Sequence, residues 1–382
     1  MLERVRVGVG RETATLLDAA GRVLAEDVTA DRDYPPVARS VRDGFAVRSR
    51  DLPGEFAVVG EVRAGGTFEG AIAERQSLEI MTGAPVPAGA DQIVMVEHAS
   101  REGDAMRTER PPAAGEFINP RGAEVHFGGV MVCAGTRLDF AHVAALATVG
   151  RTVVEVYRKP SVAILSTGDE VIPVESVPAD NQVRNSNAWS LAVQVARAGG
   201  APRVLPVAPD DMDATRELAA HALQHDLVLL SGGVSAGKYD YVERVLAEFG
   251  AEFYFDRAAI QPGQPVVFGR ARGKFFFGLP GNPSSTMVTF EIFARAAVEL
   301  LGGQSEARLP LLRSRLEGEF RHKKGLTRFL PARLSADGSH VSHVPWAGSS
   351  DVAAMARANA FLVARADRDV YEAGEEIEVM LR

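Results

Sequence analysis

The spacing of hydrophobic and polar residues changes three times along the 382-residue chain. Over residues 13–25 the apolar positions recur with helical spacing, which predicts a short amphipathic helix that Gly21 interrupts. Over residues 41–132, short β-branched runs alternate with glycine, proline and aspartate, as is typical of a β-rich module. A second short helix is expected over residues 141–149, where it can pack beside the first.

The middle of the chain alternates between buried strands and helices. Short unbroken apolar runs, typical of strands buried on both faces, occupy residues 162–165, 204–207, 227–230 and 275–277. Helical patterns occupy residues 188–198, 212–224, 241–249 and 286–301. The alternation predicts a doubly wound parallel or mixed sheet over about 159–303. Alternating positions over 307–382 predict a closing β domain, so the expected fold class is multidomain α/β.

Composition narrows the class of protein. Lys plus Arg number 42 against 50 Asp plus Glu, a formal net charge of −8, which argues against nucleic acid or anionic lipid as partners. The one cysteine, Cys133, excludes an internal disulfide framework and indicates a reducing compartment. No apolar run approaches the roughly 20 residues that span a bilayer. We therefore expect a cytoplasmic protein that binds neither nucleic acid nor membrane.

Three of the four middle strands run directly into loops of small and polar residues. In an open parallel sheet, ligands bind beyond the carboxyl ends of the strands. The loops read Ser166-Thr-Gly-Asp-Glu170, Ser231-Gly-Gly-Val-Ser-Ala-Gly237 and Gly278-Leu-Pro-Gly-Asn-Pro-Ser-Ser285. One such loop alone is more often a simple strand–helix connector. Three loops at one edge favour a binding site.

The second loop resembles the start of a phosphate-binding Walker A motif. Gly232, Gly237 and Lys238 fit that motif, but Tyr239 occupies the position that requires Ser or Thr, so a P-loop NTPase is excluded. Two histidines four residues apart, His221 and His225, lack a third metal ligand, and a solvated helix face explains them better.

Other features of these loops indicate an anionic substrate and a hard cation. Asn282 is placed to cap the next helix with Pro283 at its first position, which leaves backbone donors free for an anion. Asp169, Glu170 and Asp240 lie at the same edge and can hold Mg²⁺, the expected cofactor. The alternative for each acid is an exposed turn residue or a helix cap.

These motifs together resemble a known family. The chain is similar to the molybdopterin molybdenumtransferases, which insert molybdate into adenylylated molybdopterin, and to the C-terminal domain of gephyrin. The resemblance covers nearly the whole chain, through residues 21–28, 40–47, 80–91, 115–122, 166–170, 231–240, 279–283, 348–350 and 358–360.

The resemblance implies an elongated four-part subunit. Its parts are a linking domain (1–28 with 129–155), a β-rich domain (29–128), an α/β molybdopterin-binding domain (156–303) and a C-terminal β-barrel-like domain (304–382). It also implies a homodimer whose site is shared, with Asp43 and Thr82 supplied by the other subunit. A molybdopterin adenylyltransferase is a further expected partner.

The resemblance and the loops together give the expected site. The catalytic residues are Asp43, Thr82, Glu170 and Asp240, of which Glu170 and Asp240 bind Mg²⁺. The substrates are adenylylated molybdopterin and molybdate, and AMP is released. The substrate-binding residues are Ser166, Thr167, Gly168, Asp169, Ser231, Gly232, Gly233, Val234, Ser235, Gly237, Pro262, Gly263, Pro280, Gly281, Asn282, Pro283, Ser284 and Ser349.

Three departures from the family pattern concern charge. Gln261 and Gln264 stand where the family typically has lysines, and Pro331 stands where it has an arginine. Hydrogen bonds to charged groups contribute about 1.5–3 kcal/mol each, so two lost lysines weaken molybdate binding by roughly a hundredfold or more.

Two main hypotheses follow from these departures. The first is an active enzyme whose oxyanion site is rebuilt from Arg257, Arg328 or Ser349. The alternative is a divergent, non-catalytic paralogue that binds molybdopterin or scaffolds partner proteins. A different nucleotide-dependent transferase is a third interpretation.

Overall fold

The computed structural model describes residues 3–233 and 241–382. The chain divides into two compact units, which are described separately. The larger unit comprises residues 1–25, 135–139 and 154–382, and the smaller comprises residues 26–134 and 140–153. None of the helices in the described part of the chain is long and apolar enough to cross a membrane.

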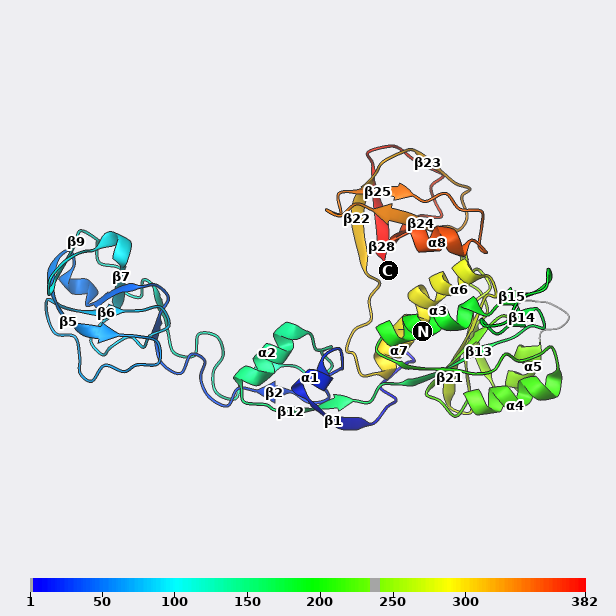
Figure 1. Cartoon of the computed structure of the whole chain (residues 1–382), viewed down its shortest axis with the longest axis horizontal. Coiled ribbons are helices and arrows are strands. Elements are labelled where there is room, and N and C mark those ends of the chain that lie inside the picture. Colours follow the sequence, from blue (N-terminus) through cyan, green and yellow to red (C-terminus); the bar gives the residue numbers. More distant parts are fainter. Residues whose placement is uncertain (1–2, 234–240) are drawn as a thin grey trace. The chain divides into compact units, whose positions relative to one another are not determined.

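A six-stranded sheet forms the centre of the larger unit (Figure 1). Four neighbouring strands are parallel: β16 (Ala201–Val204), β13 (Ser161–Ser166), β17 (Leu227–Ser231) and β21 (Lys274–Leu279). Two antiparallel strands complete it: β20 (Val267–Ala271) and β18 (Glu252–Phe255). The doubly wound sheet is confirmed, and its mixed character comes from these last two strands.

Helices cover both faces of this sheet. They are α3 (Ser186–Arg197), α4 (Met212–Ala222), α5 (Tyr241–Glu248), α6 (Pro283–Thr289), a π-helical turn η3 (Phe290–Ala294) and α7 (Arg295–Leu301). Ile164 and Leu229 pack with α3 and α7 in one core, whereas Leu165 and Leu230 pack with α4 and α5 in the other. Successive strand residues point to opposite faces, which explains why the runs are apolar without interruption.

A closed five-stranded barrel forms the C-terminal domain. Its strands are β22 (Leu311–Leu316), β24 (Thr327–Leu334), β25 (His340–His343), β26 (Ala360–Ala364) and β28 (Glu376–Leu381), and pairing of β24 with β26 closes the ring. A further strand, β19 (Ile260–Gln261), comes from the α/β domain and pairs in parallel with β24. The remaining elements are α8 (Val352–Arg357), β23 (Phe320–Arg321) and β27 (Val370–Tyr371).

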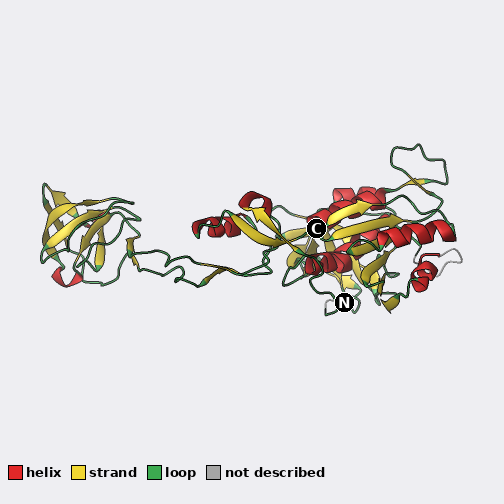
Figure 2. Ribbon diagram, turned by 90° about the horizontal axis from the view of Figure 1, so that it is seen from below, coloured by secondary structure: helices red, strands yellow, loops and turns green. Residues whose placement is uncertain are grey.

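The smaller unit holds the predicted β-rich module (Figure 2). Its six-stranded sheet has the order β7-β4-β6-β5-β9-β8, with β4 (Gly44–Val47), β5 (Gly54–Val62), β6 (Gln76–Ile80), β7 (Gln92–Met95), β8 (Ser100–Glu102) and β9 (Ala105–Thr108). Short pairs join β2 (Val28–Thr29) to β11 (Val130–Val132) and β3 (Arg39–Ser40) to β10 (Ile118–Asn119). Helix α2 (Phe140–Thr148) confirms the second short helix.

Two expected elements were wrong in extent. The helix expected over residues 13–25 is a strand, β1 (Arg11–Thr15), followed by a single helical turn, α1 (Leu16–Ala19), because β1 pairs with β12 (Val153–Tyr157). The strand expected over residues 204–207 ends at Val204. After the Leu205 N–H, which donates to the Ile164 carbonyl, the next donor to β13 is the Ala208 N–H, one residue out of register with the ladder.

Candidate functional site

The three loops converge on one edge of the α/β sheet, as predicted. Ser166 is the register partner of Ser231 on the neighbouring strand, and Ser231 is the partner of Leu279 on the next. The Thr167 N–H donates to the Ser231 carbonyl at 3.1 Å, and the Gly232 N–H donates to the Leu279 carbonyl at 3.1 Å. The loops therefore remain paired for one residue beyond their strands.

Glycines allow the loop backbones to approach each other closely. Gly232 has φ +87°, and a Cβ there would lie 3.0 Å from the Thr167 carbonyl oxygen. A Cβ on Gly281 would lie 3.7 Å from the Gly232 Cα. A larger residue at Gly232 would separate the first two loops, so the glycine content of the second loop has a direct steric cause.

A carboxylate cluster lies in the first loop. The Glu170 carboxylate folds back over Gly168, where a Cβ would lie 2.5 Å from the Glu170 Oε2. The Asp169 Oδ1 accepts the Asp210 N–H at 2.9 Å. Desolvation, together with the charges of Asp169 and Glu170, raises the pKa of Asp210. Neighbouring carboxylates of this kind are suited to binding a cation. Among the described residues, however, no three His, Cys, Asp or Glu side chains are already arranged to hold a metal ion.

Asp210, which the sequence reasoning missed, lies beside these carboxylates. It follows β16, whose end lies at the same sheet edge as the other three strand ends. The Ala208 N–H donates to the Ser166 carbonyl at 2.8 Å, which ties this fourth loop to the first. The pair Asp210-Asp211, six residues after the end of β16 and just before α4, was the available signal.

The second loop belongs only in part to the described residues. Ser231, Gly232 and Gly233 belong to the described edge, whereas Val234, Ser235, Gly237 and the predicted metal ligand Asp240 lie outside the described residues.

The third loop meets the C-terminal domain. Asn282 is the N-cap residue of α6 with Pro283 at the first position, but its side chain makes no capping bond, contrary to expectation. Its carbonyl accepts the Thr286 N–H instead, at 3.0 Å. The Ser284 N–H donates to the Ser349 carbonyl at 2.9 Å, so one helix donor is already used. This bond brings Ser349 beside Pro283 and Ser284.

The segment that contains the two unexpected glutamines lies beside β24. Pro262 and Gly263 are buried, and Gly263 packs against α6, since a Cβ there would lie 2.3 Å from the Thr289 Cγ2. Gln261 and Gln264 are exposed. Gln261 is the register partner of Arg328, so the two side chains lie on one face of the sheet.

Among the three proposed replacements for the missing charges, Arg328 is the best placed. Its Nε is buried and has no hydrogen-bond partner. Arg257 is exposed and lies 3.7 Å from the Asp256 carboxylate. Pro331 is buried in β24 and carries no charge.

Asp43 and Thr82 meet in the smaller unit. The Thr82 N–H and hydroxyl both donate to the Asp43 Oδ1, at 2.6 and 2.7 Å. The hydrogen bond from the Thr82 hydroxyl, and then the one from the Thr82 backbone N–H, hold the pKa of Asp43 below its usual value. Both residues are exposed, so the pair presents an ionised carboxylate at the surface.

Two asparagines at the start of α3 also hold the edge together, and the sequence reasoning missed both. The Asn185 Oδ1 caps α3 by accepting the Ala188 N–H at 3.1 Å and also accepts the Ser166 hydroxyl at 3.0 Å. The Asn187 Nδ2 donates to the Ser231 Oγ at 2.8 Å and to the Gly281 carbonyl at 2.7 Å. The signal for Asn185 was an asparagine at the start of a helical pattern.

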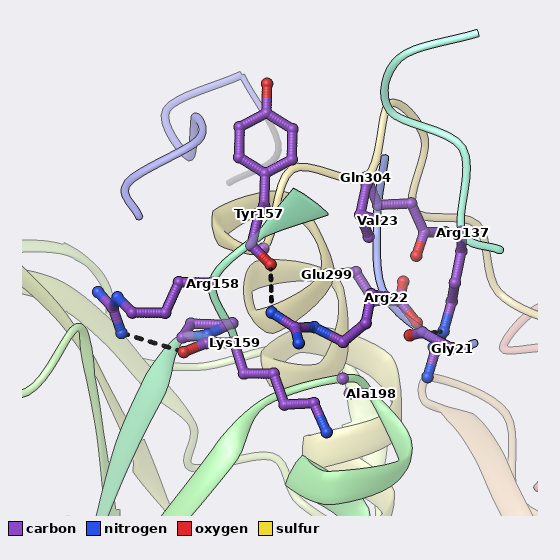
Figure 3. Close-up of a pocket in the computed structure, with 13 residues that line it drawn as sticks. Gly21, Arg22, Val23, Arg137, Tyr157, Arg158, Lys159, Ala198, Glu299 and Gln304 are labelled. Carbon is purple, nitrogen blue, oxygen red and sulfur yellow. Dashed lines mark hydrogen bonds between the residues drawn. The ribbon is translucent and has the colours of Figure 1, made fainter. Parts of the chain in front are cut away.

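A small basic pocket elsewhere in the larger unit is unsuited to a substrate (Figure 3). Its volume is about 10 Å³, which holds one water. Its arginines are already engaged: Arg158 bonds both carboxylate oxygens of Asp226, and Arg22 donates to the Tyr157 carbonyl at 2.9 Å.

Family models match the chain over three successive segments. Residues 1–150 match the MoeA N-terminal region (domain I and II), residues 163–300 match a probable molybdopterin binding domain, and residues 313–381 match the MoeA C-terminal region (domain IV).

Individual relatives span the same length. A molybdopterin molybdenumtransferase of Staphylococcus aureus (strain Mu50) is 32% identical over 379 residues, covering 97% of this chain and 90% of the relative. One from Staphylococcus epidermidis is 32% identical over 374 residues, covering 95% and 89%. Two crystal structures of a molybdopterin biosynthesis MoeA protein from Pyrococcus horikoshii superpose over the whole chain, with TM-scores of 0.82 and 0.74 at 27% and 29% identity; 97% and 96% of those chains are covered.

Proposed function

Because this chain belongs to the molybdopterin molybdenumtransferase (MoeA) family, we propose that it transfers molybdate to adenylylated molybdopterin with release of AMP. The convergence of three loops in register at one edge of the α/β sheet supports this most strongly. Loop backbones and the start of α6 gather N–H groups at this edge, and such groups bind phosphates.

The carboxylates of the first loop fit a divalent cation. Glu170 and Asp240 are the proposed Mg²⁺ ligands, and Asp169 and Asp210 extend the set. The pKa of Asp210 is raised by burial and then by the charges of Asp169 and Glu170, and a bound cation would offset both effects, which supports this assignment. Bound Mg²⁺ supplies positive charge against the phosphates of the substrate. The residues themselves orient the phosphoanhydride bond that is cleaved when AMP leaves.

Arg328 is our proposed replacement for the missing lysines. It is the register partner of Gln261, and its buried Nε has no hydrogen-bond partner. An oxyanion bound near Gln261 would satisfy this group. Ser349, beside the start of α6, is the proposed polar neighbour.

Asp43 and Thr82 complete the proposed site from a second subunit. Asp43 is ionised and exposed, as a residue that acts on a partner's substrate must be. The enzyme is therefore proposed to work as a homodimer. We place it in the cytoplasm, in line with its one cysteine, and expect an adenylyltransferase to deliver the labile substrate.

AMP release is the test of this function. Purified protein receives adenylylated molybdopterin and Mg²⁺, and AMP is measured with and without molybdate. We expect molybdate to accelerate AMP release, and Glu170→Gln to abolish the acceleration. Tight pterin binding with no molybdate-dependent turnover would instead support the non-catalytic alternative.

A further inference from the structure

We propose that Asn187 is a positioning residue for the substrate-binding edge, and this inference rests on the proposed function. Asn187 lies in the first turn of α3 and touches two loops that arrive from different strands. Its Nδ2 donates to the Ser231 Oγ at 2.8 Å and to the Gly281 carbonyl at 2.7 Å. One amide group thus joins the second loop to the third.

The orientation of this amide is determined by chemistry. The Gly281 carbonyl can only accept a hydrogen bond, so the nitrogen of the amide must face it. The Asn187 Oδ1 is consequently directed elsewhere, and it is buried with no hydrogen-bond partner. A buried acceptor without a partner costs stability. Folding stability alone therefore does not account for an asparagine here, whereas a role in holding the two loops does.

The spacing of the loops depends on contacts that Asn187 reinforces. The backbones approach at two glycines, where a Cβ on Gly281 would lie 3.7 Å from the Gly232 Cα. Among the described residues, the Gly232–Leu279 backbone bond is the last of the ladder between these two strands. Asn187 supplies the next link, from outside the sheet, at the point where loop N–H groups must be held in place for a phosphate.

The neighbouring asparagine provides a matched comparison. Asn185 is a helix cap whose Oδ1 accepts both of its bonds, from the Ala188 N–H and from the Ser166 hydroxyl. An aspartate at 185 keeps both bonds and remains a good cap. An aspartate at 187 has no N–H to give and would face the Gly281 carbonyl with a negative charge. The same substitution thus has opposite consequences two residues apart.

The experiment compares Asn187→Asp, Asn187→Ala and Asn185→Asp with the unmodified protein. AMP is the binding probe, measured by calorimetry, and turnover gives KM and kcat for adenylylated molybdopterin. For both Asn187 variants we expect Kd for AMP and KM to rise about tenfold, the effect of losing one to two hydrogen bonds, with a smaller change in kcat. For Asn185→Asp, which keeps both of its hydrogen bonds, we expect a smaller rise in Kd for AMP and in KM than for either Asn187 variant.

Thermal unfolding separates this role from a structural one. Asn187→Ala adds no charge, and we expect its Tm to stay near that of the unmodified protein while Kd rises. Equal Kd values for Asn187→Ala and the unmodified protein would overturn the inference, as would equal losses for the two aspartate variants. Lack of turnover by the unmodified protein, with the expected AMP affinities intact, would overturn the proposed function only.

Discussion

The hydroxyl of Thr82 controls the ionisation of Asp43. It donates to the Asp43 Oδ1 and is the largest cause of that group's lowered pKa. Thr82→Val keeps the shape and the backbone bond but removes the hydroxyl, so the pKa of Asp43 should rise toward its usual value. Activity that needs ionised Asp43 should then be lost at a higher pH as the solution is acidified.

The pH profile of kcat/KM measures this shift, and Thr82→Ser is the control because it retains the hydroxyl. An acid limb at the same pH in Thr82→Val and the unmodified protein would contradict the role assigned to Asp43.

Arg328 carries a second prediction at the residue scale. Arg328→Gln should raise KM for molybdate between about tenfold and a hundredfold, since hydrogen bonds to charged groups contribute about 1.5–3 kcal/mol. Gln261→Lys and Gln264→Lys should each lower KM for molybdate. KM for adenylylated molybdopterin serves as the internal control. An unchanged KM for molybdate in all three variants would show that the oxyanion binds elsewhere.

Within the C-terminal barrel, the buried His322 and the half-buried His343 link stability to pH. His322 is 9% exposed and stacks against Phe320 and Tyr371. Burial, and then the charge of Arg328, lowers the pKa of His322; a backbone contact with Lys323 and the charge of Asp369 oppose this effect. Burial also lowers the pKa of His343.

Acid should therefore destabilise this barrel. The unfolded chain binds protons on these histidines near pH 6.5, whereas the folded chain binds them only at lower pH. Stability is thus complete above about pH 6.5 and decreases as the pH falls below it. Denaturant unfolding at pH 8 and pH 5 measures this difference, followed by tryptophan fluorescence in a Trp189→Phe background so that Trp346 in the barrel is the reporter. His322→Phe keeps the stacking and should reduce the difference in stability between pH 8 and pH 5. A difference as large as that of the unmodified protein would argue against His322 as its source.

At the scale of elements, the hydrophobic periodicity of the sequence predicted the strands whose pattern is visible in consecutive residues. Apolar runs of three or four residues predicted β13, β17 and β21, and their parallel order places the loops after them at one edge. The strands β18 and β20 were not predicted, although β20 pairs with β21 through a tight turn at Arg272 and Gly273, which is a local signal. Asn187 was missed because its partners lie 44 and 94 residues away.

For the whole molecule, the proposed shared site is testable by mixing subunits. Asp43→Asn and Glu170→Gln should each be inactive, one through the β-rich unit and the other through the α/β sheet. Because half of randomly mixed dimers are heterodimers with one intact site, a mixture should recover about a quarter of full activity. Each variant mixed with itself is the control. A mixture as inactive as its components would indicate that both residues act within one subunit.

The four-part division of the chain and the dimer remain predictions, because one subunit divided into two compact units does not determine a partner's position. The spacing of residues along the sequence does not determine the partner's position either. Asp43 and Thr82 were assigned to the site by resemblance, and the structure adds that they bond each other.

Molybdenum transfer itself provides the most direct test of the proposed reaction. The enzyme is incubated with adenylylated molybdopterin, Mg²⁺ and molybdate, the pterin product is isolated, and its molybdenum content is compared with the AMP released. We predict equal amounts of incorporated molybdenum and AMP, and loss of both in Glu170→Gln. AMP release without molybdenum in the pterin would contradict the proposal that this chain inserts the metal.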